Sequence, residues 1–222
     1  MGFDIAIDGP AGAGKSTIAK GIAKRMGFVY VDTGALYRAV GLYLLKRNIP
    51  IHDREGVAKV LPDITVDLDY QEGEQQVYLL DENVTPYLRT QEVGEAASVT
   101  SAYPEVRDKL LDLQRTLAEK YDVVMDGRDI GTVVLPDADL KIYLTAEARV
   151  RARRRYDELR EKGEDVDFPV VLKEVKERDY RDMHRETAPL KKADDAVEVD
   201  SSRLSKEEVL NVIEGLITER RA

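Results

Sequence analysis

The glycine-rich stretch at residues 9–16, GPAGAGKS, constrains the fold of this chain more than any other feature. It matches the phosphate-binding pattern G-x-x-x-x-G-K-[ST], whose structural context is a turn between a buried strand and a helix. Both neighbours are present, because residues 3–7 form a short apolar run and residues 16–26 place apolar side chains at helical spacing. The backbone N–H groups of such a turn, at the positive end of a helix dipole, favour a polyphosphate ligand.

Two side chains of this loop carry specific expectations. Lys15 is expected to reach the β- and γ-phosphates of a nucleotide, and the Ser16 hydroxyl to coordinate Mg²⁺. The alternative is a glycine-rich turn that matches the pattern by accident, and the agreement of pattern, strand and helix argues against it. The loop predicts phosphate binding and leaves open what receives the phosphoryl group.

The order of elements predicts an α/β protein with a three-layer P-loop fold around a central parallel sheet. After the first strand, further buried strands are expected at residues 28–31, 123–125, 140–144 and 197–199. Helices are expected at residues 15–26, 33–47, 90–102, 105–121, 149–162 and 169–184. Ser205 is expected to cap a final amphipathic helix, with Glu208 at the capping-box position.

Residues 52–90 interrupt this alternation of strands and helices. Residues 64–70 alternate in polarity, Gly73 lies in a turn, and residues 76–80 follow as a second apolar run. This pattern predicts an antiparallel hairpin. We therefore expect residues 52–90 to form an inserted, mostly antiparallel subdomain.

The basic segment at residues 149–162 has two interpretations. It is either a solvated helix face or part of a mobile lid whose arginines close over a transferring phosphoryl group. Arg151, Arg153, Arg154 and Arg155 point in different helical directions, so no more than about two of them can reach one site. The expected organisation is one domain, 1–222, with a core of residues 1–51, 91–148 and 186–222, the insert at 52–90 and an arginine-rich helical lid at 149–185.

Composition narrows the classes of function. A net charge of −9 argues against a general nucleic-acid binder, whose surface would be basic. The absence of cysteine excludes disulfides and thiol catalysis, and with only His52 and His184 a zinc site is not expected. We find no apolar run of membrane-spanning length and no signal peptide, and we expect a cytoplasmic monomer without a nucleic-acid or membrane partner.

Polar residues follow the expected strands where an acceptor would bind. Thr33 and Arg38 come after the second strand and can bind a phosphate or a hydroxyl group. Asp126 ends a buried strand, where an acid can order the water around Mg²⁺; Arg128 can neutralise transferred charge, and Asp129 can accept from an exocyclic amine. Because the carboxyl ends of neighbouring strands face one crevice, both stretches are expected there. The alternatives are a helix cap with a surface arginine, and ordinary turn chemistry.

A third set lies near residue 180. Arg178, Asp182 and Arg185 are spaced i, i+4, i+7, which places them on one face of a helix. Such a mixed face could bind a ribose and a phosphate. The alternative is a solvated helix with ion pairs between its own turns.

The chain resembles the bacterial cytidylate kinases of the nucleoside-monophosphate kinase group over essentially its whole length. The phosphate loop is common to many families, whereas Thr-Gln-Glu-Val at 90–93 and Gly-Arg-Asp-Ile-Gly-Thr at 127–132 are far more specific. The stretches that carry the resemblance are residues 8–17, 32–38, 89–93, 97–98, 106–107, 126–132 and 176–179. One departure is Thr33, where the family commonly has serine; both side chains offer a hydroxyl group.

The resemblance implies roles for individual residues. The ATP site would comprise Gly9, Pro10, Ala11, Gly12, Ala13, Gly14, Lys15, Ser16 and Thr17. The CMP site would comprise Thr33, Arg38, Ser98, Arg107, Arg128, Asp129, Arg178, Asp182 and Arg185. Catalysis would depend on Lys15, Arg128, Arg178 and Arg185, and Mg²⁺ would be held by Ser16 and, through water, by Asp126. Within the CMP site, Ser98, Arg107 and Asp129 would bind the cytosine edge, whereas Arg178 and Asp182 would contact the pentose.

The activity that the resemblance implies is ATP-dependent phosphorylation of CMP and dCMP to CDP and dCDP by direct in-line transfer. An inventory of many arginines without cysteine or a placed histidine suits this chemistry, because phosphoryl transfer needs positioning and charge neutralisation. The alternatives are a P-loop kinase for another small acceptor, such as UMP, AMP or shikimate, and a non-catalytic regulatory nucleotide-binding protein. Guanine-specificity and switch motifs, which the last would need, are not found.

Overall fold

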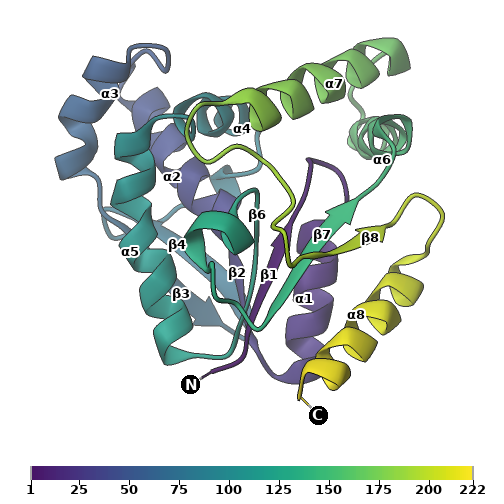
Figure 1. Ribbon diagram of the computed structural model, residues 1–222. Coiled ribbons are helices and arrows are strands. Elements are labelled where there is room, and N and C mark those ends of the chain that lie inside the picture. The colour runs from purple at the N-terminus through teal and green to yellow at the C-terminus, as the bar shows by residue number, and fades with distance from the viewer. Residues whose placement is uncertain (1, 222) are drawn as a thin grey trace. The chain divides into compact units, whose positions relative to one another are not determined.

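The computed structural model describes residues 2–221, and the contacts within it divide the chain into two units (Figure 1). Residues 2 and 29–123 form the first unit, and residues 3–28 and 124–221 form the second. The glycine-rich loop at residues 9–16 belongs to the second unit. The inserted segment at residues 52–90 belongs to the first, together with the helices that precede and follow it.

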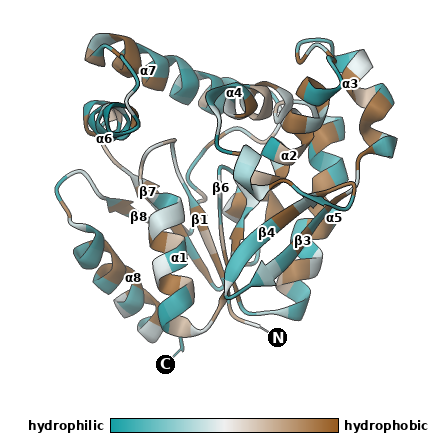
Figure 2. Ribbon diagram, turned by 180° about the vertical axis from the view of Figure 1, so that it is seen from behind, coloured by the Kyte–Doolittle hydropathy of each residue, from teal (hydrophilic) through white to brown (hydrophobic). Residues whose placement is uncertain are grey.

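The strands of the second unit build most of a central parallel sheet. They are β1 (Asp4–Asp8), β6 (Val123–Gly127), β7 (Leu140–Thr145) and β8 (Val197–Asp200). Their order is β6-β1-β7-β8, and the sheet has five strands, with β2 as the fifth. The β1–β7 and β7–β8 pairs are parallel, with Ile5 opposite Leu140 and Ile142 opposite Val197. Hydrophobic residues dominate β1 and β6 (Figure 2), as expected for strands covered on both faces. The predicted parallel sheet is confirmed.

Four helices belong to the second unit: α1 (Lys15–Met26), α6 (Ala148–Glu161), α7 (Phe168–His184) and α8 (Lys206–Arg221). Their ends follow from local sequence. Gly27 ends α1 in the left-handed conformation, with φ of 73°, which glycine adopts without a steric penalty. Ser205 and Glu208 form the predicted capping box: the Glu208 carboxylate accepts from the Ser205 N–H at 2.8 Å, and the Ser205 hydroxyl accepts from the Glu208 N–H at 3.3 Å.

Helices α6 and α7 pack against each other around a small apolar cluster of their own. Ala152, Leu159 and Val171 are buried in it, and the rings of Tyr156 and Phe168 meet edge to face with centroids 5.9 Å apart. A π-helical turn at Ile130–Val134 follows β6. No helix among residues 2–221 has the length and apolar character needed to cross a membrane.

The first unit begins with β2 (Val29–Asp32) and α2 (Thr33–Lys46). The segment that follows contains α3 (Arg54–Val60) and a three-stranded sheet of β3 (Val66–Gln71), β4 (Glu74–Leu79) and β5 (Glu82–Asn83). Helices α4 (Gln91–Thr100) and α5 (Pro104–Lys120) complete the unit. Strands β3 and β4 pair antiparallel, with Val66 opposite Leu79, which confirms the predicted hairpin. The short α3 and β5 were not predicted.

The core of the first unit is centred on α2. Leu36, Val40 and Leu44 are buried in a cluster that includes apolar side chains of α3, β3, β4, α4 and α5. Helix α4 approaches α2 closely at Gly41, where an added Cβ would lie 3.1 Å from both the Ala96 Cβ and the Ala97 nitrogen. The small sheet is therefore packed on the same core as the helix that starts at Thr33.

The close approach of α2 and α4 predicts a stability effect. Gly41→Leu is expected to lower the free energy of unfolding by about 1–3 kcal/mol, because the added side chain meets the α4 backbone. Gly94→Ala in α4 is the matched control: its added Cβ meets no atom within 4 Å, and alanine favours the helix by about 0.5–1 kcal/mol. Denaturant unfolding measures both, and a Gly41→Leu protein as stable as the wild type would contradict this packing.

Candidate active site

The glycine-rich loop has the backbone geometry that its pattern predicts. Gly9, Gly12 and Gly14 have φ of 149°, 77° and 95°, a region that residues with side chains rarely adopt. A Cβ on Gly9 would lie 2.0 Å from the Leu144 carbonyl oxygen, so only glycine fits beside β7. The loop leads directly into α1, and no side chain within residues 2–221 caps the start of that helix. Its first N–H groups are thus suited to an anionic ligand.

Lys15, the first residue of α1, is buried below the loop with only 6% of its surface exposed. Its Nζ donates to the Pro10 carbonyl at 2.9 Å. Burial lowers the pKa of Lys15 to about 7, and the positive charge of Arg128 adds to this effect, while Asp126, Asp182 and Asp8 oppose it. A polyphosphate beside Lys15 would supply the negative charge that restores an ammonium group.

Ser16 and Asp126 place two oxygen donors side by side behind the loop. The Ser16 Oγ donates to the Asp126 Oδ2 at 3.0 Å, and Asp126, the fourth residue of β6, is buried. Hydroxyl and carboxylate oxygens suit Mg²⁺, which takes its other ligands from phosphates and water. No group of three or more acidic or histidine side chains that could hold a metal occurs within residues 2–221. The donor set therefore fits Mg²⁺ that arrives with a nucleotide.

Arg128 and Asp182 bring a second pair of charges into the same unit. The Arg128 Nε donates to the Asp182 Oδ2 at 2.8 Å, and only 4% of Asp182 is exposed. Burial alone would raise the pKa of Asp182, but the positive charges of Arg128, Arg178 and Arg185 outweigh it and lower that pKa. Asp182 is therefore ionised and holds Arg128 in place, near enough to Lys15 to influence its pKa.

Arg185 and Asp129 complete this group of charges. The Arg185 Nη2 lies 3.5 Å from the Asp129 Oδ1, both side chains are buried, and the Arg185 Nε donates to the Ala188 carbonyl at 2.7 Å. Helix α7 ends at His184, and Arg185 already has an extended backbone. Its N–H nevertheless donates to the Arg181 carbonyl at 3.1 Å, as in the helix, and the positive charges of Arg178 and Arg185 both act on Asp182, which agrees with the expected shared face.

Asp8 is a site residue that the sequence reasoning missed. Its carboxylate accepts from the Ile130 and Gly131 N–H groups, each at 2.8 Å, and thus ties the end of β1 to the turn after Asp129. Burial raises the pKa of Asp8 to about 6, against the effect of these two hydrogen bonds. An acid between an apolar strand and the phosphate loop is the signal that could have identified it.

Two of the α6 arginines reach the phosphate loop. Arg151 is buried; its Nη1 donates to the Ala11 carbonyl at 3.0 Å, and its guanidinium binds both carboxylate oxygens of Asp179, at 2.9 and 2.6 Å. The Arg154 Nη2 donates to the Ser201 carbonyl at 2.8 Å, and its Nη1 lies 3.4 Å from the Ala13 carbonyl oxygen. These contacts join α6 to the back of the loop.

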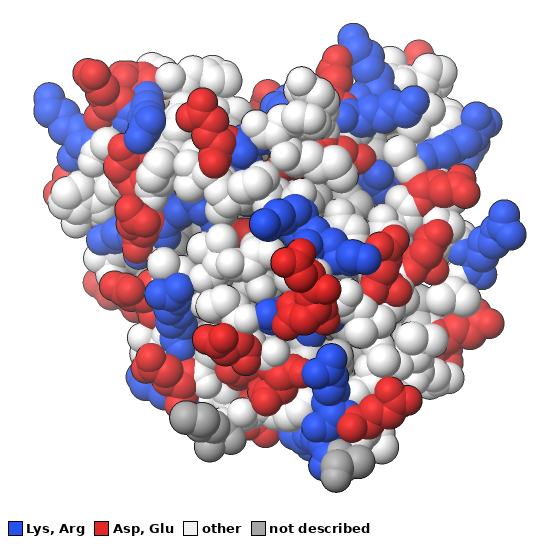
Figure 3. Space-filling view, in the orientation of Figure 1, with Lys and Arg blue, Asp and Glu red and all other residues white. Residues whose placement is uncertain are grey.

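The other two arginines turn away from the loop. The Arg153 guanidinium lies 4.4 Å from the centroid of the Phe168 ring, and Arg155 pairs with Glu158 at 3.2 Å. The limit of about two arginines at one site agrees with this arrangement. Basic and acidic side chains are interspersed over the face shown in Figure 3, as expected for a chain with solvated helices.

In the first unit, Thr33 and Arg38 lie at the start of α2 around Asp32. Asp32 caps the helix by accepting from the Ala35 N–H at 3.0 Å. The other oxygen of its carboxylate lies 3.5 Å from the Arg38 Nη1 and 3.3 Å from the Arg89 Nη2. Two arginines thus share one carboxylate. Arg89 was not predicted as a site residue, because its partner lies 57 positions away in the sequence.

The polar groups of Ser98 on α4 and Arg107 on α5 are withdrawn from solvent. The Ser98 Oγ is buried and has no hydrogen-bond partner within residues 2–221, which costs free energy unless a ligand satisfies it. Arg107 is 7% exposed; it donates to the Ser101 carbonyl at 3.3 Å and lies 5.5 Å from the centroid of the Tyr37 ring. Tyr37 and the end of α4 therefore orient Arg107.

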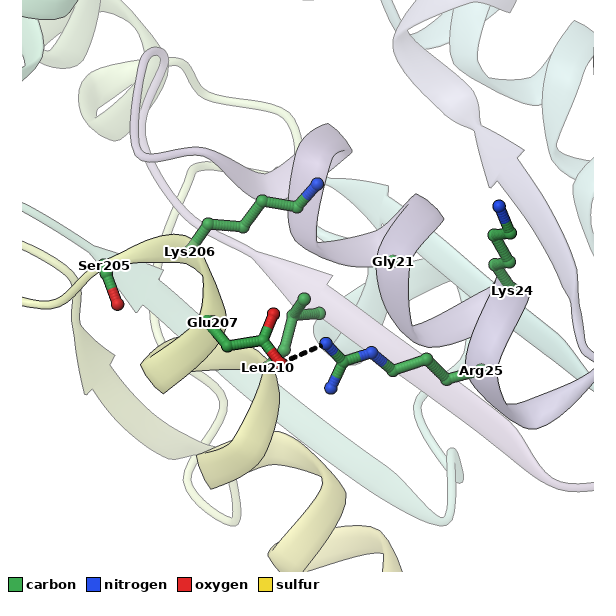
Figure 4. Close-up of a pocket in the computed structure, with 7 residues that line it drawn as sticks. All are labelled: Gly21, Lys24, Arg25, Ser205, Lys206, Glu207 and Leu210. Atoms are coloured by element: carbon green, nitrogen blue, oxygen red, sulfur yellow. Dashed lines mark hydrogen bonds and ion pairs between the residues drawn. The ribbon is translucent and has the colours of Figure 1, made fainter.

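A cavity between α1 and α8 lies apart from these residues (Figure 4). It has a volume of 710 Å³ and is lined by Gly21, Lys24, Arg25, Ser205, Lys206, Glu207 and Leu210. Arg25 is neutralised by Glu207 at 2.6 Å and by Glu214 at 2.9 Å. None of the predicted site residues lines this cavity, and we assign it no chemistry.

A glycine-rich loop between β1 and α1, with a buried lysine and a Ser–Asp pair behind it, defines a P-loop nucleotide-binding fold. A sugar kinase structure from Janibacter sp. HTCC2649 shares this fold, with a TM-score of 0.50 at 14% identity over 98% of this chain and 95% of its own. The family model for cytidylate kinase matches residues 5–219. The chain belongs to the cytidylate kinase family.

Several curated cytidylate kinases are similar to this chain over nearly their whole length. A cytidylate kinase from Caldicellulosiruptor bescii is 52% identical over 95% of this chain and 93% of its own. One from Exiguobacterium sp. is 49% identical over 99% of this chain and 98% of its own. One from Lactobacillus johnsonii is 45% identical over 99% of this chain and 95% of its own.

The position of Asp8 generates a pH prediction. Its pKa is raised from 3.8 to about 6, so the folded state binds the proton more tightly than the unfolded state between these values. The stability that this group contributes is present below pH 4 and lost as the pH rises through 6. The advantage in unfolding free energy of wild type over Asp8→Asn should therefore shrink by about 2 kcal/mol between pH 4 and pH 7.

Denaturant unfolding of both proteins across this range provides the measurement. Other titrating groups cancel in the difference between them, so a difference independent of pH would mean that Asp8 is not held in this environment.

Proposed function

We propose that this chain transfers the γ-phosphoryl group of ATP to CMP and dCMP, forming CDP and dCDP by direct in-line transfer. The observation that carries the proposal is the buried group of charges beside the phosphate loop, formed by Lys15, Arg128 and their carboxylate partners. Membership of the cytidylate kinase family supports CMP as the acceptor.

On the donor side, residues 9–17 would bind the phosphates of ATP. The N–H groups of the loop and of the first turn of α1 suit the α- and β-phosphates, and Lys15 suits the β- and γ-phosphates. Ser16 and, through water, Asp126 would hold Mg²⁺, whose positive charge would offset the negative charge of the phosphates.

On the acceptor side, Thr33 and Arg38 would bind the 5′-phosphate of CMP. The unsatisfied Ser98 hydroxyl, with Arg107 and Asp129, offers the donors and acceptors that a cytosine edge requires. Arg178 and Asp182 would contact the pentose. Asp182 also binds Arg128. The same carboxylate would therefore contact the pentose and hold that arginine in place.

During transfer, negative charge spreads over the equatorial oxygens of the phosphoryl group. Lys15 and Arg128 would stabilise it, with Arg178 and Arg185 contributing from the end of α7. None of these residues need form a covalent intermediate. We propose that residues 149–185 act as a lid, since α6 and α7 form one packed pair joined to the phosphate loop through Arg151.

The remaining parts of the assignment follow from this chemistry. Residues 52–90 would be the monophosphate-binding insert, and residues 1–51, 91–148 and 186–222 the core. We expect the protein to act as a monomer. ATP and nucleoside monophosphates occur together in the cytoplasm, where we expect the protein to act. A non-catalytic nucleotide-binding role would leave the acceptor residues without a purpose.

The proposal is tested by measuring ADP formation from ATP and Mg²⁺ with each of CMP, dCMP, UMP, dUMP, AMP, GMP and shikimate. CMP and dCMP are expected to give kcat/KM values at least about 100-fold above those of UMP, because the cytosine amine satisfies acceptors that the uracil carbonyl would leave unpaired. UMP or AMP as the preferred acceptor would assign a different kinase, and no acceptor-dependent ADP formation would indicate a binding protein.

A further inference from the structure

Strand β2 stands at one end of the central strand order, so one of its edges has no neighbouring strand. An edge strand presents a row of backbone N–H and C=O groups that need other partners. Because orientation alternates along a strand, Tyr30 and Asp32 present their backbone groups on the same side. What satisfies these groups determines where β2 ends and therefore where α2, which begins at Thr33, starts.

Side chains of the small antiparallel sheet supply the partners. The Tyr70 hydroxyl, from β3, donates to the Tyr30 carbonyl at 3.1 Å. The Gln75 amide, from β4, makes both hydrogen bonds that a strand residue would make to Asp32. Its Oε1 accepts from the Asp32 N–H at 2.8 Å, and its Nε2 donates to the Asp32 carbonyl at 3.3 Å.

Both side chains are withdrawn from water. Gln75 is only 9% exposed although it carries a polar amide, and burial raises the pKa of the Tyr70 hydroxyl. Buried amides are retained where their hydrogen bonds are made, because an unsatisfied one costs about 1–3 kcal/mol. Gln75 is therefore fixed on the Asp32 backbone and is not an exposed strand residue of β4.

Because its backbone is held by Gln75, Asp32 also fixes the residues that its carboxylate contacts. Its carboxylate caps α2 at the Ala35 N–H and lies 3.5 Å from Arg38 and 3.3 Å from Arg89. The buried Asp32 carboxylate is held by the Ala35 N–H three residues on, so displacement of this backbone displaces the anion that both arginines face. The small sheet thus sets the position of the charged groups at the start of α2.

We propose that Gln75, assisted by Tyr70, is a positioning residue for the acceptor phosphate: it fixes Asp32 and through it Thr33 and Arg38. This inference rests on the proposed assignment of Thr33 and Arg38 to the acceptor's phosphate. In this account the inserted sheet contributes to acceptor binding by positioning Asp32, without contact between Gln75 and the nucleotide.

The experiment compares Gln75→Ala with Gln76→Ala as matched control. Gln76 is the next residue of β4; its amide faces the opposite side of the strand, where its Oε1 accepts from Asn83 at 3.1 Å. Gln75→Ala is expected to raise the KM for CMP about tenfold, because misplacing binding groups by about an ångström has effects of this size or larger. The KM for ATP should stay within about twofold of wild type, as should both constants in Gln76→Ala.

A second variant covers the case in which Gln75→Ala does not fold. Tyr70→Phe removes one hydroxyl group, and with it the bond to the Tyr30 carbonyl, and is expected to raise the KM for CMP about threefold. Thermal unfolding of every variant accompanies the kinetics. A merely structural role would lower the unfolding temperature and change both KM values alike, whereas a positioning role changes the KM for CMP alone.

The outcomes separate this inference from the proposed function. If wild type phosphorylates CMP and the variants retain its KM for CMP, the positioning role is wrong and the function stands. If wild type prefers another monophosphate, the assignment of CMP fails, and the same comparison with that acceptor tests Gln75, because its proposed effect is on the phosphate. Equal changes in both KM values also overturn the inference.

Discussion

The burial of Lys15 beneath the phosphate loop is the constraint on which the rest of the second unit depends. An ammonium group with 6% of its surface exposed is costly to bury, and its Nζ donates a hydrogen bond to the uncharged Pro10 carbonyl. The chain balances it with Asp8, Asp126 and Asp182, and then adds Arg128, whose charge opposes the ammonium form. This group of charges is close to balance without a ligand, and a polyphosphate would stabilise its cations.

Local sequence determined much of what could be predicted. The limits of α1, the C-cap at Gly27, the Ser205–Glu208 capping box and the β3–β4 hairpin depend on residues a few positions apart, and all are confirmed. Lys15 and Ser16 could be anticipated because the loop pattern carries its own mechanism, and Asp126 because it is an acid at the end of a buried strand. The family resemblance added Ser98 and Arg107, which no local pattern identifies.

The site residues that were missed depend on contacts between distant positions. The Asp8 carboxylate meets the Ile130 and Gly131 N–H groups more than 120 residues later, and Gln75 meets Asp32 at a separation of 43. The sequence alone predicts that Gln75 is an exposed residue of the hairpin, because it does not show that the edge of β2 lies beside it.

The central claim is that polyphosphate completes the charge balance around Lys15, and proton uptake on binding tests it most directly. With a pKa of about 7, most Lys15 side chains are neutral at pH 8 in the unliganded protein, and phosphates should return this pKa close to its ordinary value of 10.5. Calorimetric titration of wild type with MgADP at pH 8, in two buffers of different ionisation enthalpy, should therefore show uptake of nearly one proton. Lys15→Arg, which keeps its charge at every accessible pH, should show none. Equal uptake in both proteins, or none in wild type, would contradict the account.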